Sequence, residues 1–154
     1  MPNAVTLIRS SSLSDAAEYA YAATAPADAR LIFLAGSCPL NEDGSTTGVG
    51  DYAAQAAKCI ENMSTALSEA GASIEDVIST RVLVASTKQA DLVTAWEVVR
   101  DAFGEHDAPS TLLGVKSLDM TTSLLRLRRS QRSATEETVL PRGPSVPRRR
   151  SPGQ

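Results

Sequence analysis

Residues 51–84 read DYAAQAAKCIENMSTALSEAGASIEDVISTRVLV, and this stretch decides the order of the secondary-structure elements. Asp51 suits a helix N-cap, because its carboxylate can accept hydrogen bonds from the N–H groups that the first turn leaves without partners. Gly71 is the expected terminator, since glycine adopts left-handed backbone conformations at little cost. Between them, apolar residues recur at spacings of three and four, which mark one face of an α-helix: Ala53, Ala56, Ala57, Ile60, Met63, Ala66, Leu67 and Ala70. The pattern predicts a helix over residues 51–70.

A strand and a second helix follow this first helix. Residues 77–84 alternate, with Ile78, Thr80, Val82 and Val84 on one side and Ser79, Arg81 and Leu83 on the other. Such alternation predicts a β-strand. Ser86 or Thr87 can then cap a second helix, which Gly104 follows. Its inner face is predicted to hold Leu92, Ala95, Trp96, Val99 and Phe103.

Shorter β-prone segments flank this region on both sides. Residues 31–36, LIFLAG, form an apolar run that a glycine stops, which is typical of a buried strand. Residues 5–8 and 19–24 are weaker strand candidates, and residues 41–44, NEDG, have the composition of a turn. After Ala108-Pro109, residues 111–115 predict one more strand.

The resulting order, β-β-β-α-β-α-β, predicts an α+β fold in which a mixed sheet carries both helices on one face. The other face of that sheet would stay apolar and uncovered. An exposed apolar face of this size predicts self-association.

Charge divides the chain of 154 residues into two unequal parts. Residues 1–125 hold seven Lys and Arg against sixteen Asp and Glu, whereas residues 126–154 hold eight Arg and two Glu. An acidic body, which we assign to residues 1–125 as one α+β domain, is therefore followed by a basic end. Residues 133–154 are rich in Arg and Pro without periodicity, so we predict a disordered tail without a dedicated nucleic-acid partner.

Other features narrow the class of protein. No apolar run approaches the ~20 residues that a membrane helix needs, and the apolar stretch near residue 5 is too short for a secretory leader. We therefore expect a cytoplasmic protein in which Cys38 and Cys59 stay reduced. Zinc ligand sets and phosphate loops are not recognisable, and we expect no metal and no cofactor. His106 has no partner that the sequence fixes, and we interpret it as a surface residue.

Four segments, in order and at matching spacing, resemble the Rid family, the RidA/YjgF-type reactive intermediate deaminases. The similarity spans residues 4–118. The segments are LIFLAGSCPL at 31–40 with the Asp43-Gly44 turn, Gln55 with IENM at 60–63, GASIEDVI at 71–78, and FGEH at 103–106 with APST at 108–111 and Gly114-Val115.

The resemblance implies a chorismate-mutase-like α+β fold and a homotrimer with ligand clefts between subunits. Threefold packing would bury the bare sheet face. Where Rid proteins are active, they hydrolyse enamines and imines such as 2-aminoacrylate and release ammonia without metal or coenzyme. The resemblance thus implies a small-molecule ligand and further copies of the chain as partners.

The family's cleft residues map onto a changed set in this chain. Ser110 stands where the family has the Arg that binds the substrate carboxylate, and a hydroxyl cannot replace that bidentate cation. The remaining cleft candidates are Tyr19 (with Tyr21 as a weaker match) for the family's Tyr, Ala35, Gly36 and Ser37 at its Ser-Gly-Gln step, Trp96 at a helix Asn, and Leu112 two residues after Ser110. A role for Trp96 and Leu112 in packing alone stays open, and we assign no catalytic residue.

The C-terminal part departs from the family's last strand, which reads Val-Glu-Ile-Glu-Ala. One choice of synonymous codons for Asp119–Arg132, read after the addition of a single base, encodes Gly-Tyr-Asp-Asp-Gln-Leu-Val-Glu-Ile-Glu-Ala-Val-Ala-Ala. We hypothesise a single-base deletion near Leu118, which puts Arg126 at the family's Glu position. A guanidinium cannot carry the proton there, because Arg stays protonated. Leu124, Leu125 and Leu127 can still supply a substitute strand.

Three functions remain open from the sequence. The first is hydrolysis of an enamine or imine by a variant of the Rid route. The second is non-catalytic binding of a metabolite in the clefts of a trimer. In the third, the chain is an inactive family member with a frameshifted end.

Overall fold

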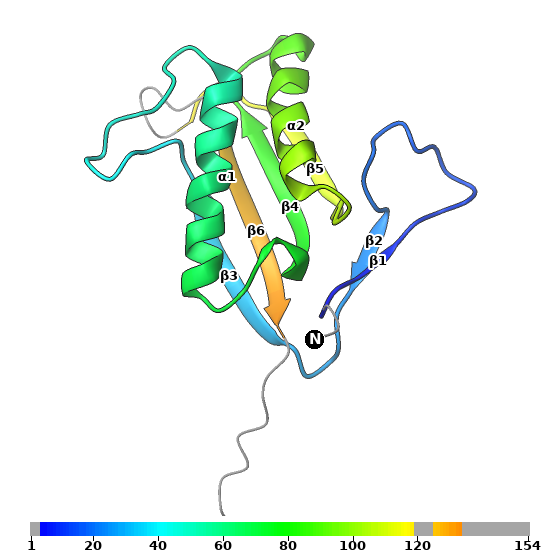
Figure 1. Ribbon diagram of the computed structural model, residues 1–154. Helices are drawn as coiled ribbons and strands as arrows, with labels where there is room; N and C mark the ends of the chain where they lie inside the picture. The colour runs from blue at the N-terminus through cyan, green and yellow to red at the C-terminus, as the bar shows by residue number, and fades with distance from the viewer. Residues whose placement is uncertain (1–3, 119–124, 134–154) are drawn as a thin grey trace, which may run out of the picture.

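The computed structural model describes residues 4–118 and 125–133, the side chains in the first range only. Within these residues, two α-helices lie side by side across one face of a four-stranded sheet (Figure 1). This confirms the predicted α+β architecture with both helices on one side. Apart from Ser133, the predicted tail lies outside the described residues, as do Asp119–Leu124.

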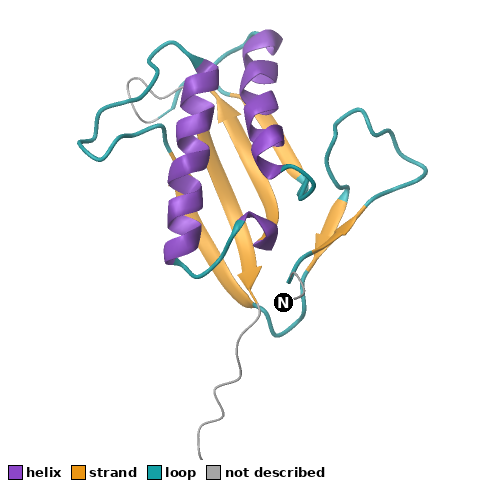
Figure 2. Ribbon diagram, in the orientation of Figure 1, coloured by secondary structure: helices purple, strands orange, loops and turns teal. Residues whose placement is uncertain are grey.

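The strand order in the sheet is β3-β6-β4-β5. β4 and β5 run parallel, whereas β6 is antiparallel to both of its neighbours, so the sheet is mixed as predicted. The strands are β3 (Arg30–Ser37), β4 (Val77–Val84), β5 (Ser110–Gly114) and β6 (Leu125–Ser133). The shorter β1 (Thr6–Ile8) and β2 (Ala22–Thr24) pair in a hairpin beside the sheet (Figure 2).

The substitute strand expected near the C-terminus is present as β6. It begins at Leu125 and joins the edge strand β3 to β4 in the middle of the sheet. In its register with β4, Leu127 lies opposite Val82, Arg126 opposite Leu83 and Arg128 opposite Arg81. The strand therefore closes a gap that would otherwise split the sheet in two.

Helix α1 (Tyr52–Glu69) has the predicted ends but a different buried face. The Asp51 carboxylate accepts the N–H of Ala54 at 3.0 Å. The expected inward position of Ala57 is wrong, because Ala57 is exposed. The buried residues are Gln55, Ala56, Cys59, Met63 and Leu67. Polar Gln55 tolerates burial because its amide donates to the Gly48 carbonyl at 3.2 Å. A prediction from apolar residues alone therefore left Gln55 out of the buried face of the helix.

Helix α2 (Gln89–Phe103) buries Ala95, Val99 and Phe103 as predicted. Its start differs from the prediction, since Lys88 occupies the N-cap and makes no side-chain cap bond. Ser86, two residues before the N-cap, makes the side-chain hydrogen bonds at this end of the helix. Its hydroxyl accepts the Lys88 N–H at 3.0 Å and donates to the Asp91 carboxylate at 2.6 Å, which fixes the entry into the helix.

Within residues 4–118 and 125–133, no element covers the sheet face away from the helices, as expected. Leu31, Phe33 and Leu113 are 45%, 71% and 46% exposed, whereas Ile32, which alternates with the first two, is buried. Arg81 on β4, between these strands in the sheet, is also exposed. The face that helices leave uncovered is therefore apolar at its edges and carries a cation nearer its centre.

His106 is buried, so its interpretation as a surface residue is wrong. Its Nε2 atom lies 2.8 Å from the Val77 carbonyl oxygen, where a protonated ring nitrogen donates to that acceptor. The residue lies in the loop that leads from α2 to β5, and this loop packs against the start of β4 at Val77. Because the Val77 carbonyl gains a partner there, His106 serves to pin this loop.

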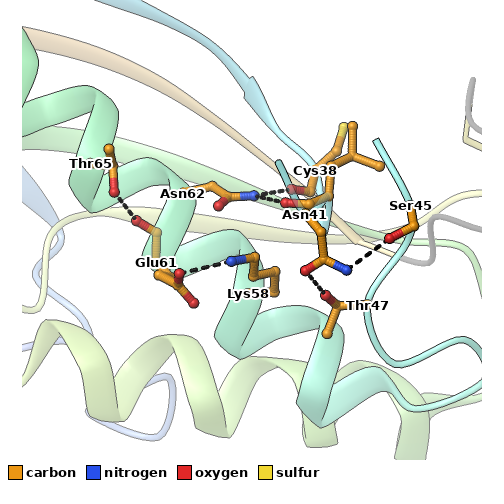
Figure 3. Close-up of polar contacts among 9 residues, drawn as sticks. Cys38, Asn41, Ser45, Thr47, Lys58, Glu61, Asn62 and Thr65 are labelled. Atoms are coloured by element: carbon orange, nitrogen blue, oxygen red, sulfur yellow. Dashed lines mark hydrogen bonds and ion pairs between the residues drawn. The ribbon is translucent and has the colours of Figure 1, made fainter. Parts of the chain in front are cut away.

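Asn62 ties the loop after β3 to helix α1 (Figure 3). Its Nδ2 donates to the carbonyl oxygens of Cys38 at 2.9 Å and Leu40 at 2.8 Å. Farther along the same loop, Asn41 donates to the Ser45 hydroxyl and accepts from the Thr47 hydroxyl. The loop therefore holds its own shape and is anchored to the helix through one amide.

Replacing Asn62 by Leu is expected to lower the free energy of unfolding by roughly 1–3 kcal/mol, because two part-buried carbonyls lose their donor while the volume is kept. Urea unfolding measures the change. The matched control is Thr65→Val on the same helix, whose exposed hydroxyl only donates to the Glu61 carbonyl. Equal stabilities of the two variants would contradict the role given to Asn62.

Candidate functional site

Four of the predicted cleft residues meet around one groove. Tyr19 comes from the loop before β2, Trp96 from α2, and Ser110 and Leu112 from β5. They border a hollow of about 530 Å³, which we call the Trp96 groove. Its full lining is Ala16, Ala17, Glu18, Tyr19, Val93, Trp96, Glu97, Arg100, Ser110, Thr111 and Leu112.

An aromatic pair forms one wall of the Trp96 groove. The rings of Tyr19 and Trp96 are 5.8 Å apart between centroids and are inclined at 86°, which is edge-to-face packing. Both side chains are half-buried. Trp96 therefore helps to hold the Tyr19 loop against α2, yet both residues still line the groove.

Ser110, which the sequence resemblance matches to the family's Arg, has no charge to offer. Its hydroxyl donates to the carbonyl of Ala108 at 2.8 Å. The single proton of that hydroxyl is thus used within the chain. At this point the groove lacks the cation that holds a substrate carboxylate in the family pattern.

Arg100 brings a cation to the groove from another element. Its guanidinium donates through Nη1 to the Glu18 carboxylate at 2.7 Å and through Nε to the Asp101 carboxylate at 3.0 Å. These bonds, that to Glu18 foremost, raise the pKa of Arg100 above its ordinary value. The guanidinium therefore stays charged at any physiological pH.

Arg100, Glu97 and Glu18 also line the groove, although they were not predicted from the sequence. The position of Arg100 beside the groove could have been predicted, because it lies four residues after Trp96 and such residues are neighbours on a helix. No pattern indicated Glu18, since it lies in an irregular loop. Its φ of +54° is unusual for a residue other than glycine.

The loop that carries Glu18 and Tyr19 is anchored on both sides. At its start, the Arg9 guanidinium holds both carboxylate oxygens of Asp107, at 2.7 and 2.9 Å. At its end, the Ala20 N–H donates to the Asp107 carbonyl at 2.7 Å. Asp107 in the loop after α2 thereby positions the Tyr19 wall of the groove.

Ala35, Gly36 and Ser37 do not reach this groove within one chain. They lie on β3, at a shift in pairing register between Leu34 and Ser37. Strands β6 and β4 separate β3 from β5. The predicted cleft set is thus divided between opposite edges of the sheet.

Several other chemistries find no support in the described part of the chain. No three His, Cys, Asp or Glu side chains among these residues are grouped to hold a metal ion. Burial raises the pKa of the Cys59 thiol, which makes it a poor nucleophile. No helix within residues 4–118 is long and apolar enough to span a membrane.

Comparison with known proteins places these features in a family. A family model described as Endoribonuclease L-PSP matches residues 10–124. A RutC family protein of Pyrococcus abyssi is 35% identical over 75 residues, which are 49% of this chain and 58% of the relative. The chain thus matches only a little over half the length of that curated relative.

Solved structures show the same fold at low identity. The Rid-family protein YyfB from Yersinia pestis, described as of unknown function, superposes with a TM-score of 0.77 at 21% identity, over 84% of this chain and 98% of its own. RidA from an Antarctic Psychrobacter has a TM-score of 0.60 at 17% identity, over 81% and 93% of the two chains. A Mycobacterium tuberculosis member of the YjgF/YER057c/UK114 family has a TM-score of 0.57 at 24% identity, over 83% and 98%. The match of the family model over most of the chain, together with this fold, shows that the protein belongs to the Rid (YjgF, endoribonuclease L-PSP) family.

Proposed function

We propose that the protein binds a small, largely apolar metabolite in the Trp96 groove and does not catalyse ordinary Rid deamination. The observation that carries this proposal is the convergence of Tyr19, Trp96, Ser110 and Leu112 on one hollow of about 530 Å³. Concave, mainly apolar sites with a few polar groups are typical of small-molecule binding.

The proposed assembly is the homotrimer of the family. The uncovered sheet face with Leu31 and Phe33 supports it, because exposed apolar side chains that gather on one face mark sites of protein–protein contact. In the proposed trimer, Ala35, Gly36 and Ser37 of one chain complete the groove of its neighbour. The two groups of cleft residues, far apart in one chain, then form one site.

Two replacements argue against deamination. Ser110 removes the cation at the family's Arg position, and its hydroxyl is already bonded to Ala108. Arg126 stands at the family's Glu position, where a group that exchanges protons is needed. The groove has instead gained an indole and a leucine side chain, which favour binding of apolar surface over acid–base chemistry.

RNA cleavage, which the family description names, is not proposed for this chain. Residues 1–125 carry sixteen Asp and Glu against seven Lys and Arg, a balance that repels phosphate. The Trp96 groove is lined by Glu18 and Glu97 against the single cation Arg100. Both facts favour a small metabolite.

The purified protein, given 2-aminoacrylate generated in situ, is expected to release ammonia no faster than buffer alone. In parallel, a metabolite panel is screened by thermal unfolding. A ligand at one hundred times its Kd should add about 2.7 kcal/mol of stability and raise Tm by roughly 5–11 °C. Ammonia release well above buffer would overturn the non-catalytic assignment, and a panel without any stabilising compound would count against binding.

A further inference from the structure

A second hollow, of about 380 Å³, lies between α1 and the loop after β3, and we call it the α1 groove. It shares no lining residue with the Trp96 groove, so it is a separate surface of the molecule. Figure 3 shows part of it, where side chains of the helix face those of the loop. The polar side chains of its lining that matter below are Asn41, Glu42, Lys58, Glu61, Asn62 and Glu69.

The α1 groove carries an excess of negative charge. Three of its residues are glutamates, whereas Lys58 is the single cation among the described residues that line it. The ammonium group of Lys58 lies 2.7 Å from the Glu61 carboxylate. Glu42 and Glu69 are exposed, and within residues 4–118 neither forms an ion pair. Two carboxylates of the groove therefore keep a charge that the described part of the chain does not offset.

The C-terminal end of α1 adds to this negative charge. The last carbonyls of a helix lack intrahelical partners, and that end of the helix has a partial negative charge. The last turn of α1 contains no basic residue and ends on Glu69. From the neighbouring strand β3, Arg30 donates to the Ala70 carbonyl at 2.6 Å. Because cations stabilise such a helix end, the α1 groove favours a cationic partner.

The chain has cations of its own in the segment that follows β6. Residues 134–154 lie outside the described residues, and they contain Arg142 and Arg148–Arg150 against Glu136 and Glu137. We call Arg148–Arg150 the arginine run. A guanidinium presents its donors in a planar fork that matches a carboxylate, which makes Arg well suited to pair with glutamates. The arginine run therefore complements the α1 groove in charge and in hydrogen bonding.

Strand β6 brings this segment to the groove. Its last residue, Ser133, is paired with Arg30 at the start of β3. Arg30 in turn contacts Ala70, which follows Glu69 at one end of the groove. The chain from Ser133 to Arg148 spans up to ~50 Å when extended, whereas α1 is only ~27 Å long. Every part of the groove is therefore within reach of the arginine run.

We propose that the C-terminal segment folds back along α1 and that its arginine run occupies the α1 groove, where it pairs with Glu42 and Glu69. Attachment to the same chain gives the segment an effective concentration on the order of millimolar at the groove, so exposed ion pairs that are weak singly suffice to hold it. The groove and the uncovered sheet face lie on opposite sides of the sheet. The contact therefore does not compete with the proposed trimer.

The test lets the attached segment compete with a free copy of itself. A fluorescent peptide of residues 141–154 is titrated with full-length protein at low salt, and its anisotropy gives the Kd. The full-length triple variant Arg148→Gln, Arg149→Gln, Arg150→Gln is expected to bind the peptide at least tenfold more tightly than the parent chain, because the parent's own arginine run fills the groove. Salt at 0.5 M should weaken the binding, since exposed charges are screened.

Further substitutions locate the contact on α1. In the triple variant, Glu42→Gln and Glu69→Gln are each expected to weaken the peptide at least threefold. Glu105→Gln is the matched control, because it removes the same charge from an exposed residue in the loop after α2, outside the groove, and it should leave the Kd unchanged. Circular dichroism verifies that every variant is folded.

Three results would overturn the inference. Equal affinities of the parent chain and the triple variant would mean that the attached segment does not occupy the groove. Equal effects of Glu42→Gln, Glu69→Gln and Glu105→Gln would reduce the attraction to the net charge of the acidic body. A light-scattering mass that rises with concentration for the parent but not for the triple variant would assign the arginine run to another copy of the chain.

Discussion

Replacing Phe33 by Asp is expected to convert the protein from a trimer into a folded monomer. Phe33 is 71% exposed on the uncovered sheet face and does not belong to the core cluster of its own chain. In the proposed trimer, burial of this ring stabilises the contact by roughly 2 kcal/mol per chain. A carboxylate at that place would lose its hydration without a hydrogen-bond partner, which costs several kcal/mol more.

Light scattering on the intact chain provides the measurement. The parent protein should have three times the 16.2 kDa mass of one chain, and Phe33→Asp should have the mass of one. Val49→Asp is the control, because Val49 is similarly exposed, at 66%, but lies in the loop before α1 and not on a strand of the sheet. A parent protein that is monomeric, or a trimer that survives Phe33→Asp, contradicts the proposed assembly.

Replacing Leu67 by Ala is expected to lower the free energy of unfolding by about 3 kcal/mol. Leu67 on α1 is fully buried and belongs to the cluster that joins both helices to β4. Removing its side-chain atoms forfeits their transfer free energy and leaves a cavity that a packed core fills only in part, with typical costs of about 2–5 kcal/mol. That loss is a large share of the stability of a small domain.

Chemical denaturation checks this second expectation. Leu13→Ala removes the same atoms from a side chain that is 56% exposed in the loop after β1, and it should change the unfolding free energy by less than about 0.5 kcal/mol. If the two variants were equally stable, the placement of α1 against the sheet would have to be revised.

β6 pairs within the sheet although its sequence does not resemble the last strand of the family pattern. The sequence Leu125-Arg126-Leu127-Arg128 alternates apolar and charged residues, as a strand does. Its backbone pairs with β3 on one side and β4 on the other. Backbone hydrogen bonding thus supports the strand whether the hypothesis of a base deletion near Leu118 holds or not, and sequencing the gene across that codon tests it.

The sequence alone determined both helices, the strands before and between them and β5, together with their order along the chain. Asp51 and Gly71 marked the ends of α1, and alternation marked β4 with its observed limits, because capping and periodicity depend only on residues close in the chain. The matches around residues 31–40 and 103–115 likewise indicated the family, since they record local motifs at a fixed spacing.

Only the tertiary structure decided which side chains meet. It brought Tyr19 and Ser110 to Trp96 and left Gly36 at the opposite edge of the sheet, because strand order depends on pairings between segments far apart in sequence. It also buried His106 against the Val77 carbonyl and placed Glu18 on Arg100 across 82 residues of chain. Such contacts arise from the packing of whole elements, and no local pattern in the sequence encodes them.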